Sequence, residues 1–382
     1  MIEKKANCER PILLVSESFH NADMYYATRF QAPDRFVYFC SGANETLLVS
    51  PMEQGRAKKE SCVKDVRTTD DYGYMERLKE LKDQDRALAA TIMGFLSGNG
   101  VKSVMVPKDF PLHLADLLRA GGIQVSAAEK LFDKKREIKT PEEIEFIIQS
   151  QRINEKAMKR AIDMIRKSEP KEGVLYHKGK PLTAEMLQRE IELTYIKNGC
   201  DASDTITACG PRSADPHFAG EGPVMANQPI VLDLFPYSKK TRYFADMTRT
   251  VVRGKASPKL KEMYELVLEA QQIAIAAIKP GVTGKYVNDL VCEHFEKHGY
   301  GTTRTKSNTG FIHSTGHGVG INIHEGPWIG ESGLEPLQTG NVVTAEPGLY
   351  LPDVGGVRIE DMVVVTEKGC IDITKFPKQL EV

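Results

Sequence analysis

Strand-like apolar runs and helical segments share the first third of the chain. The apolar runs cover Ile12–Val15, Phe36–Phe39, Thr46–Val49 and Ser103–Val106, and the helical segments cover Tyr74–Leu81, Arg86–Leu96 and Leu112–Arg119. This mixture of short strands and helices predicts a separate α/β region at the start of the chain.

A second region begins near residue 139. Thr140-Pro141-Glu142-Glu143 supplies an N-cap residue, a proline at the first helical position and a glutamate at the third, a capping box that starts a helix. A partly periodic apolar face continues this helix to about Lys167. We therefore expect two domains, residues 1–138 and 139–382, and the 382 residues are enough for each to bury its own core.

Further helices are predicted where a capping residue precedes an apolar-periodic segment and glycine or proline follows it. They are expected over residues 183–199, 257–280 and 283–299. The polar segment Ser168–Leu182 contains several glycine and proline residues, so we expect a mobile loop there.

Acidic residues interrupt apolar runs in the second region. Asp233 lies inside Pro229–Phe235, a run of strand length, and Asp246 begins the run that returns after a polar turn. A hairpin would therefore bring these two aspartates to neighbouring positions. Glu346 and Glu360 also lie within β-prone sequence. An isolated buried carboxylate is costly, so such acids need a cation.

His317 lies between two glycines, which allow the close backbone approach that a metal-bound imidazole in a crowded site requires. Any one acid alone would be interpreted as a surface residue, but the shared context favours a common site. Carboxylate oxygens with one imidazole nitrogen suit Mn, Co, Fe or Zn, and four carboxylates would neutralise two divalent cations. The predicted ligands are Asp233, Asp246, His317, Glu346 and Glu360.

Five strings of sequence resemble the pita-bread metallopeptidases, and within them the Xaa-Pro peptidases aminopeptidase P and prolidase. In chain order these strings are GPRSADPHF, DLFPYSKKTRYFADMTRT, STGHGVGINIHEGP, AEPGLY and GVRIEDMVVVT. The resemblance implies an α+β protein with a C-terminal pita-bread catalytic domain and a smaller α/β creatinase-like N-terminal domain. Methionine aminopeptidase lacks that N-terminal domain.

The resemblance also implies how the five ligands divide between two metal ions. Asp233 would chelate one metal, Asp246 and Glu360 would bridge both, and His317 and Glu346 would complete the other.

Other matched positions are implied to act on the substrate. His217 and His324 match histidines that contact the substrate and stabilise the tetrahedral intermediate, and His313 matches one near the proline subsite. Glu346, or another metal-bound carboxylate, could also carry the proton to the leaving nitrogen. Period-two alternation on a continuous strand over residues 356–365 would place Arg358 beside the Glu360 carboxylate, which it could orient, and we count Arg358 with His313 among the substrate-binding candidates.

The implied reaction is hydrolysis of the Xaa-Pro bond at the N-terminus of peptides, with a metal-bridging hydroxide as the attacking group. Aminopeptidase P and prolidase both remain open, because no arginine that reads a dipeptide carboxylate can be assigned. The Asp233–Asp246 hairpin is longer than is usual in the family, which could reshape a pocket wall. The alternative is a non-catalytic binding protein or a metal-free, creatinase-like hydrolase of the same fold, but such relatives lose the acids.

Composition limits the partners. A net charge of −1, with 41% hydrophobic and 27% charged residues, is ordinary for a globular protein and gives no reason to expect nucleic acid or an anionic membrane as a partner.

No segment approaches the ~20 apolar residues of a membrane span, and the run after Pro11 is too short for a signal peptide core, so a cytoplasmic protein is expected. The basic run Lys134-Lys135-Arg136 is expected on solvated surface. The family resemblance suggests a homodimer.

Seven cysteines are scattered along the chain without a C-x-x-C motif. We expect free thiols rather than a disulfide framework or a zinc knuckle.

Overall fold

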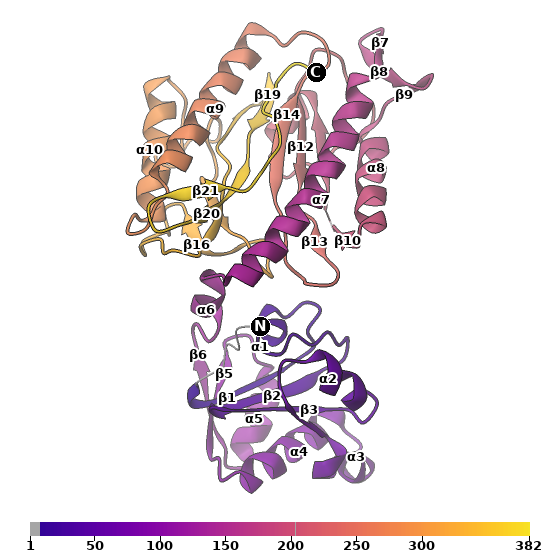
Figure 1. The fold of residues 1–382 in the computed structure, drawn as a ribbon, viewed down its shortest axis with the longest axis vertical. Helices are drawn as coiled ribbons and strands as arrows, with labels where there is room; N and C mark the ends of the chain where they lie inside the picture. Colours follow the sequence, from indigo (N-terminus) through magenta and orange to yellow (C-terminus); the bar gives the residue numbers. More distant parts are fainter. Residues whose placement is uncertain (1–7, 203) are drawn as a thin grey trace. The chain divides into compact units, whose positions relative to one another are not determined.

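The computed structural model describes residues 8–202 and 204–382. The chain divides after Lys134, within helix α6 (Asp133–Glu137), into two compact units (Figure 1). Within the described residues, no helix combines the length and the apolar composition that crossing a membrane requires.

The N-terminal unit is built on one six-stranded sheet of order β4-β3-β2-β1-β5-β6. β1, β2 and β3 pair antiparallel, whereas β3–β4, β1–β5 and β5–β6 pair parallel. The strands are β1 (Cys8–Ser16), β2 (Phe36–Gly42), β3 (Asn44–Val49), β4 (Asp65–Thr68), β5 (Ser103–Pro107) and β6 (Gln124–Ala128). The helices are α1 (Ala22–Thr28), α2 (Gln54–Glu60), the 3₁₀ turn η1 (Asp70–Tyr72), α3 (Tyr74–Leu81), α4 (Gln84–Gly98) and α5 (Leu112–Ala120).

One expectation for this unit is wrong. Cys8 and Cys40 form a disulfide bond, with their Cα atoms 6.1 Å apart, instead of remaining free thiols. The antiparallel pairing of β1 with β2 brings the two residues together, because Cys8 lies opposite Gly42, two residues from Cys40. The sequence separation of 32 residues concealed this pairing from the spacing argument.

Four helices of the C-terminal unit begin where the sequence predicts. They are α7 (Pro141–Arg166), α8 (Ala184–Lys197), α9 (Pro258–Ala277) and α10 (Gly284–Lys297). The side chains of Thr140, Thr183, Ser257 and Thr283 each accept a hydrogen bond from a backbone N–H of the first turn, and Glu143 completes the capping box of α7. These caps satisfy N–H groups that have no partner within a helix.

The strands of this unit form two main sheets, of order β11-β12-β14 and β16-β15-β17-β20-β21, with β18 and β19 paired beside them. The α7–α8 pair packs on the first sheet and the α9–α10 pair on the second (Figure 1). The strands are β10 (Cys200–Asp201), β11 (Ile206–Cys209), β12 (Ile230–Leu234), β13 (Tyr237–Ser238), β14 (Met247–Val251), β15 (Gly316–Gly318), β16 (Glu325–Ile329), β17 (Val342–Ala345), β18 (Gly348–Leu351), β19 (Gly355–Arg358), β20 (Asp361–Val365) and β21 (Cys370–Asp372), and the 3₁₀ turn η2 covers Gly210–Ala214.

The segment expected to be a mobile loop is a small antiparallel sheet. Its strands are β7 (Glu169–Lys171), β8 (Val174–His177) and β9 (Lys180–Pro181). Glu172-Gly173 and Lys178-Gly179 each place two consecutive residues at positive φ, the backbone that a two-residue hairpin turn requires. The two glycines that suggested a loop, Gly173 and Gly179, therefore lie in the turns of two hairpins.

The expectation of a fully solvated basic run is also wrong, because Arg136 is 8% exposed. Its guanidinium Nη1 donates to the Glu325 carboxylate at 3.0 Å, within the C-terminal unit. Lys135 is exposed, as expected.

Candidate metal centre

The β12–β14 hairpin carries the two aspartates. Antiparallel pairing places Asp233 opposite Thr248, and Asp246 lies directly before the first residue of β14. Tyr237 and Ser238, in the connection between the two strands, form β13, which pairs with β10. Both aspartates lie at the end of the hairpin that this connection closes.

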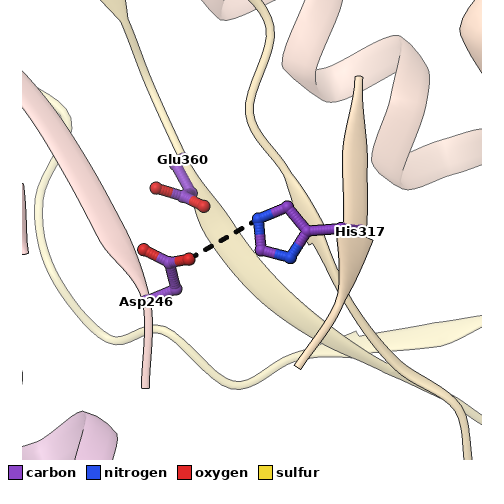
Figure 2. A group of neighbouring side chains, drawn as sticks. All are labelled: Asp246, His317 and Glu360. Carbon is purple, nitrogen blue, oxygen red and sulfur yellow. Dashed lines mark ion pairs between the residues drawn. The ribbon is translucent and has the colours of Figure 1, made fainter. Parts of the chain in front are cut away.

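Asp246, His317 and Glu360 meet in the interior of the C-terminal unit. One potential ligand atom from each lies within 4.8 Å of the others, and all three side chains are buried. Figure 2 shows the two carboxylates facing the imidazole ring, whose Nε2 is 3.7 Å from Asp246 Oδ2. The three residues come from the hairpin, from β15 and from the junction between β19 and β20.

Glu346 joins the site through His317. Its Oε1 is 3.1 Å from His317 Nε2 and accepts a hydrogen bond from the Thr344 hydroxyl at 3.2 Å. The other ring nitrogen, Nδ1, lies 3.2 Å from the Gly318 carbonyl, which can only accept, so Nδ1 carries a proton. A metal ion would replace the proton that Nε2 otherwise donates to Glu346 Oε1, while Nδ1 keeps its own proton.

Asp233 joins the site through Thr248 and Arg358. The Thr248 hydroxyl lies 2.9 Å from Asp233 Oδ1 and 2.7 Å from Glu360 Oε2, and its single proton can be donated to one of them at a time. Arg358 Nη2 contacts Asp233 Oδ2 at 2.5 Å, and Arg358 Nε donates to the Thr248 oxygen at 3.2 Å.

The expectation of one continuous strand over residues 356–365 is wrong. β19 ends at Arg358 and pairs with β18, whereas β20 begins at Asp361 and pairs with β17. The chain changes sheets between them, so Glu360 occupies a junction. Arg358 consequently holds Asp233 and Thr248, and the hydrogen bond to the Glu360 carboxylate comes from Thr248.

The electrostatics of the described residues fit a cation. Burial, followed by repulsion from Glu360, raises the pKa of Asp246, and burial, followed by repulsion from Glu346, raises the pKa of Glu360. Burial also acts to raise the pKa of Glu346, but the hydrogen bond and charge of His317, together with the charges of His313 and Arg358, outweigh it and lower that pKa to about 2. The Glu360 Oε1 atom is buried without a hydrogen-bond donor. Carboxylates crowded in this way with an imidazole suit a divalent metal ion.

Three histidines were assigned to substrate. The His324 ring packs edge-on against the His317 ring, with the two ring centroids 4.4 Å apart. His324 itself is exposed. His217 is exposed as well, and its backbone N–H donates to Asp215. His313 Nε2 lies 2.8 Å from the Tyr350 hydroxyl.

Tyr350 links His313 to the carboxylate cluster. Arg358 Nη1 donates to its oxygen at 2.6 Å, and burial raises the pKa of Tyr350 to about 12, so the phenol remains protonated and donates to His313. Sequence reasoning missed Tyr350 and Thr248 as members of this network, although both lie in the quoted strings. Their only signal is that each lies close in sequence to a predicted ligand.

Arg249 was missed as well. Nη1 of this arginine donates to the carbonyls of Thr248 and Glu360, and its Nη2 pairs with Asp361 at 2.7 Å. It therefore fixes the backbone on both sides of the carboxylate cluster.

Comparison with known proteins decides the family. The profile described as "Metallopeptidase family M24" matches residues 145–367. The chain belongs to metallopeptidase family M24.

Named relatives of this M24 metallopeptidase are similar in both sequence and structure. An Xaa-Pro dipeptidase of Pyrococcus horikoshii is 30% identical over 94% of this chain and 92% of the relative. An Xaa-Pro dipeptidase of Pyrococcus furiosus is 40% identical over 64% of this chain, and that alignment spans 65% of the relative, slightly under two thirds of its length. The crystal structure of an X-Pro aminopeptidase from Thermotoga maritima superposes with a TM-score of 0.82, at 28% identity, over 98% of this chain and 97% of the other.

These comparisons confirm the family resemblance, the α+β pita-bread fold with a smaller N-terminal domain, and the expectation of an enzyme. The M24 metallopeptidase is a metallo-exopeptidase, and its family implies a divalent metal ion. The roles of the individual site residues stay predictions.

Proposed function

We propose that this M24 metallopeptidase hydrolyses the bond between the first residue and a following proline, with Xaa-Pro dipeptides as its preferred substrates. The proposal rests on one observation: the side chains of Asp246, His317 and Glu360 are buried, and one potential ligand atom from each lies within 4.8 Å of the others. The dipeptide preference is supported by the relative that aligns over nearly the whole chain, which is named an Xaa-Pro dipeptidase.

Two divalent metal ions are proposed to be held by the full ligand set. The crowding of four carboxylates supports two ions, because one would leave much of their charge uncompensated. The ions would supply a water that is acidic near neutral pH and would polarise the scissile carbonyl. Mn, Co, Zn and Fe all suit these ligands. The proposed ligands are Asp233, Asp246, His317, Glu346 and Glu360.

The histidines would act on the substrate carbonyl and the proline ring. His324, exposed beside His317, would donate a ring N–H to the oxygen on which negative charge develops. Glu346 would accept a proton and return it to the departing prolyl nitrogen. His217 would contact the same carbonyl from the exposed segment after η2, and His313 would line the proline subsite.

The hydrogen-bond chain from His313 through Tyr350 and Arg358 to Asp233 supports positioning of both ends of the site. Each donor in this chain has an acceptor, so the ring of His313 and the carboxylate of Asp233 are oriented before a substrate arrives. Such preorganisation is what an active site needs in order to favour the transition state.

Matched peptides test the proposal. Xaa-Pro, Xaa-Pro-Yaa and Xaa-Ala peptides would be assayed after chelation and again after Mn, Co, Zn or Fe is restored. We expect metal-dependent cleavage before proline only, with the dipeptide cleaved fastest. Faster cleavage of the tripeptide would replace the dipeptidase proposal with an aminopeptidase. Absence of cleavage with every metal would favour a binding protein or a metal-free hydrolase.

We also propose a homodimer, on the family resemblance alone. Light scattering that gives a monomer with full activity would reject it.

A further inference from the structure

A buried ion cluster lies directly behind His324. The next residue, Glu325, is 6% exposed, although its neighbour His324 is exposed. Its carboxylate meets two cations, with Arg136 Nη1 at 3.0 Å and Lys139 Nζ at 2.9 Å. The contact between Lys139 Nζ and Glu325 Oε1 is an ion pair. It is not a hydrogen bond, because neither of these two atoms has a hydrogen-bond partner.

Burying one anion and two cations is costly unless the arrangement is maintained by the fold. The side chains of Lys139 and Glu325 are 1% and 5% exposed, so water does not screen their attraction. The two cations come from the segment that precedes α7, whereas Glu325 opens β16. The cluster therefore ties the start of α7 to the strand that follows His324.

The loop before Glu325 is packed on the same carboxylate. A Cβ atom added to Gly320 would lie 2.2 Å from Glu325 Oε1, so a larger residue there would displace the carboxylate from its present position. The carbonyl of Gly320 accepts from the backbone N–H of Phe244, at 2.8 Å. The backbone N–H of Asn322 is 3.4 Å from the Glu325 carboxylate. Both ends of the short loop over residues 320–325 are therefore anchored.

The pairing of β15 with β16 connects this anchor to the metal centre. Gly318, the residue after His317, lies opposite Glu325. His317 and His324 consequently stand side by side, with ring centroids 4.4 Å apart. Glu325 is the first residue of β16 and follows His324 directly, so the ion cluster holds the chain next to the residue that carries the ring.

We propose that Glu325, held by Arg136 and Lys139, is a positioning residue that fixes the imidazole of His324 toward the substrate. The three charges take no part in the chemistry, and they act by immobilising the loop that carries His324. The proposal rests on the role of His324 in the proposed function, and it adds the residues that make that role possible.

The test combines kinetics with a measurement on the metal-free protein. Glu325→Gln removes the negative charge at nearly constant size, and Lys139→Met removes one cation while leaving the Arg136 contact. We expect each to lower kcat at least severalfold, within the roughly 10²-fold that a misplacement of about 1 Å can cost, with little change in KM or in metal stoichiometry. Glu192→Gln, at an exposed position on α8, is the matched control and should leave kcat unchanged.

Histidine ring signals in NMR spectra of the metal-free protein provide a readout that does not depend on activity. The signal of His324, assigned through His324→Ala, should shift or broaden in both variants, whereas that of His294 on α10 should not. Unchanged His324 signals together with unchanged kcat would overturn the proposal. If Glu325→Gln fails to fold, Lys139→Met gives the same two readouts.

A double-mutant cycle separates this proposal from the proposed function. In the His324→Ala background, Glu325→Gln should cause no further loss of kcat, because its effect passes through the missing ring. If the kcat losses of the two single variants multiply in the double variant, Glu325 acts independently of the His324 ring, and the positioning role is rejected. If His324→Ala alone retains full kcat, the role of His324 in the proposed function fails, and the NMR signals still decide whether Glu325 positions the ring.

Discussion

Arg358 and Asp233 form an ion pair, with Nη2 and Oδ2 2.5 Å apart and their side chains 4% and 13% exposed. The same guanidinium donates to Tyr350 and Thr248, so one side chain orients a carboxylate, a phenol and a hydroxyl. A charge placed in this way would orient the Asp233 carboxylate toward the proposed metal ions. Groups that orient ligands commonly affect metal affinity as strongly as activity.

Arg358→Met is expected to weaken metal binding and to lower kcat by about 10- to 100-fold, the range typical for loss of a residue that orients a ligand. The carboxylate of Asp233 loses its cation, and the hydroxyls of Tyr350 and Thr248 lose a donor. Calorimetric titration of metal into the metal-free protein measures the affinity. Arg160→Met, at an exposed position on α7, is the control. Equal metal affinity in Arg358→Met and the control would contradict the role assigned to Arg358.

The metal-free protein is expected to lose stability as the pH rises. Burial, followed by repulsion from neighbouring carboxylates, raises the pKa values of Asp246 and Glu360 above those of the unfolded chain. Between the ordinary and the raised pKa, the folded state binds more protons than the unfolded state, so the free energy of unfolding falls with increasing pH. The decline begins above the ordinary carboxylate range, near pH 4.

Thermal unfolding across this range, with and without added metal, tests the expectation. Asp246→Asn should flatten the decline, because one of the repelling charges is gone. Added metal should restore stability most strongly at high pH, where the carboxylates are ionised. A melting temperature of the metal-free protein that rises steadily with pH would contradict this account.

The sequence predicted the helices and the strands that carry the proposed ligands, because both depend on local signals. Thr140 and Thr183 are capping residues that lie next to the turns they cap, and Asp233 stands out within its apolar run. The network of Thr248 and Tyr350 could not be predicted in this way. Its members meet only after two sheets have formed, and nothing near them in sequence specifies the partner.

Charged and glycine-containing segments caused the errors for a related reason. Arg136 was expected on the surface because most arginines are exposed, and its buried partner Glu325 lies 189 residues away. Gly173 and Gly179 were interpreted as loop residues, whereas positive φ at Glu172 and Lys178 turns the same segments into hairpins. Here the missing information is the conformation of the residue before each glycine.

Loss of the Cys8–Cys40 disulfide is expected to destabilise the N-terminal unit. A cross-link across 32 residues restricts the unfolded chain, and disulfides of this kind typically stabilise by about 2–4 kcal/mol. Cys40→Ser should therefore lower the unfolding temperature, and a reductant should then have no further effect. Cys62→Ser, at a free cysteine, is the control. If a reductant leaves the unfolding of the unaltered protein unchanged, the bond contributes nothing to stability.

Thr248→Val is expected to lower metal affinity by about 10- to 100-fold, as for other residues that orient ligands. Valine keeps the size and branching of threonine but removes the hydroxyl, which lies 2.9 Å from Asp233 and 2.7 Å from Glu360. Asp233 and Glu360 lose the one hydroxyl proton that they share, and Arg358 Nε loses its acceptor. Thr248→Ser keeps the hydroxyl and should retain metal affinity within a few-fold.

The control for Thr248→Val must also remove a buried hydroxyl from a strand of the same sheet. Thr207→Val does so on β11, where the hydroxyl donates to the Ala184 carbonyl at 3.2 Å. This variant should lower stability by about 1 kcal/mol, the typical contribution of one hydrogen bond, and leave metal affinity unchanged. If metal titration shows that both valine variants lose the same metal affinity, the loss results from general destabilisation. A loss confined to Thr248→Val would show that this hydroxyl aligns the carboxylates of Asp233 and Glu360.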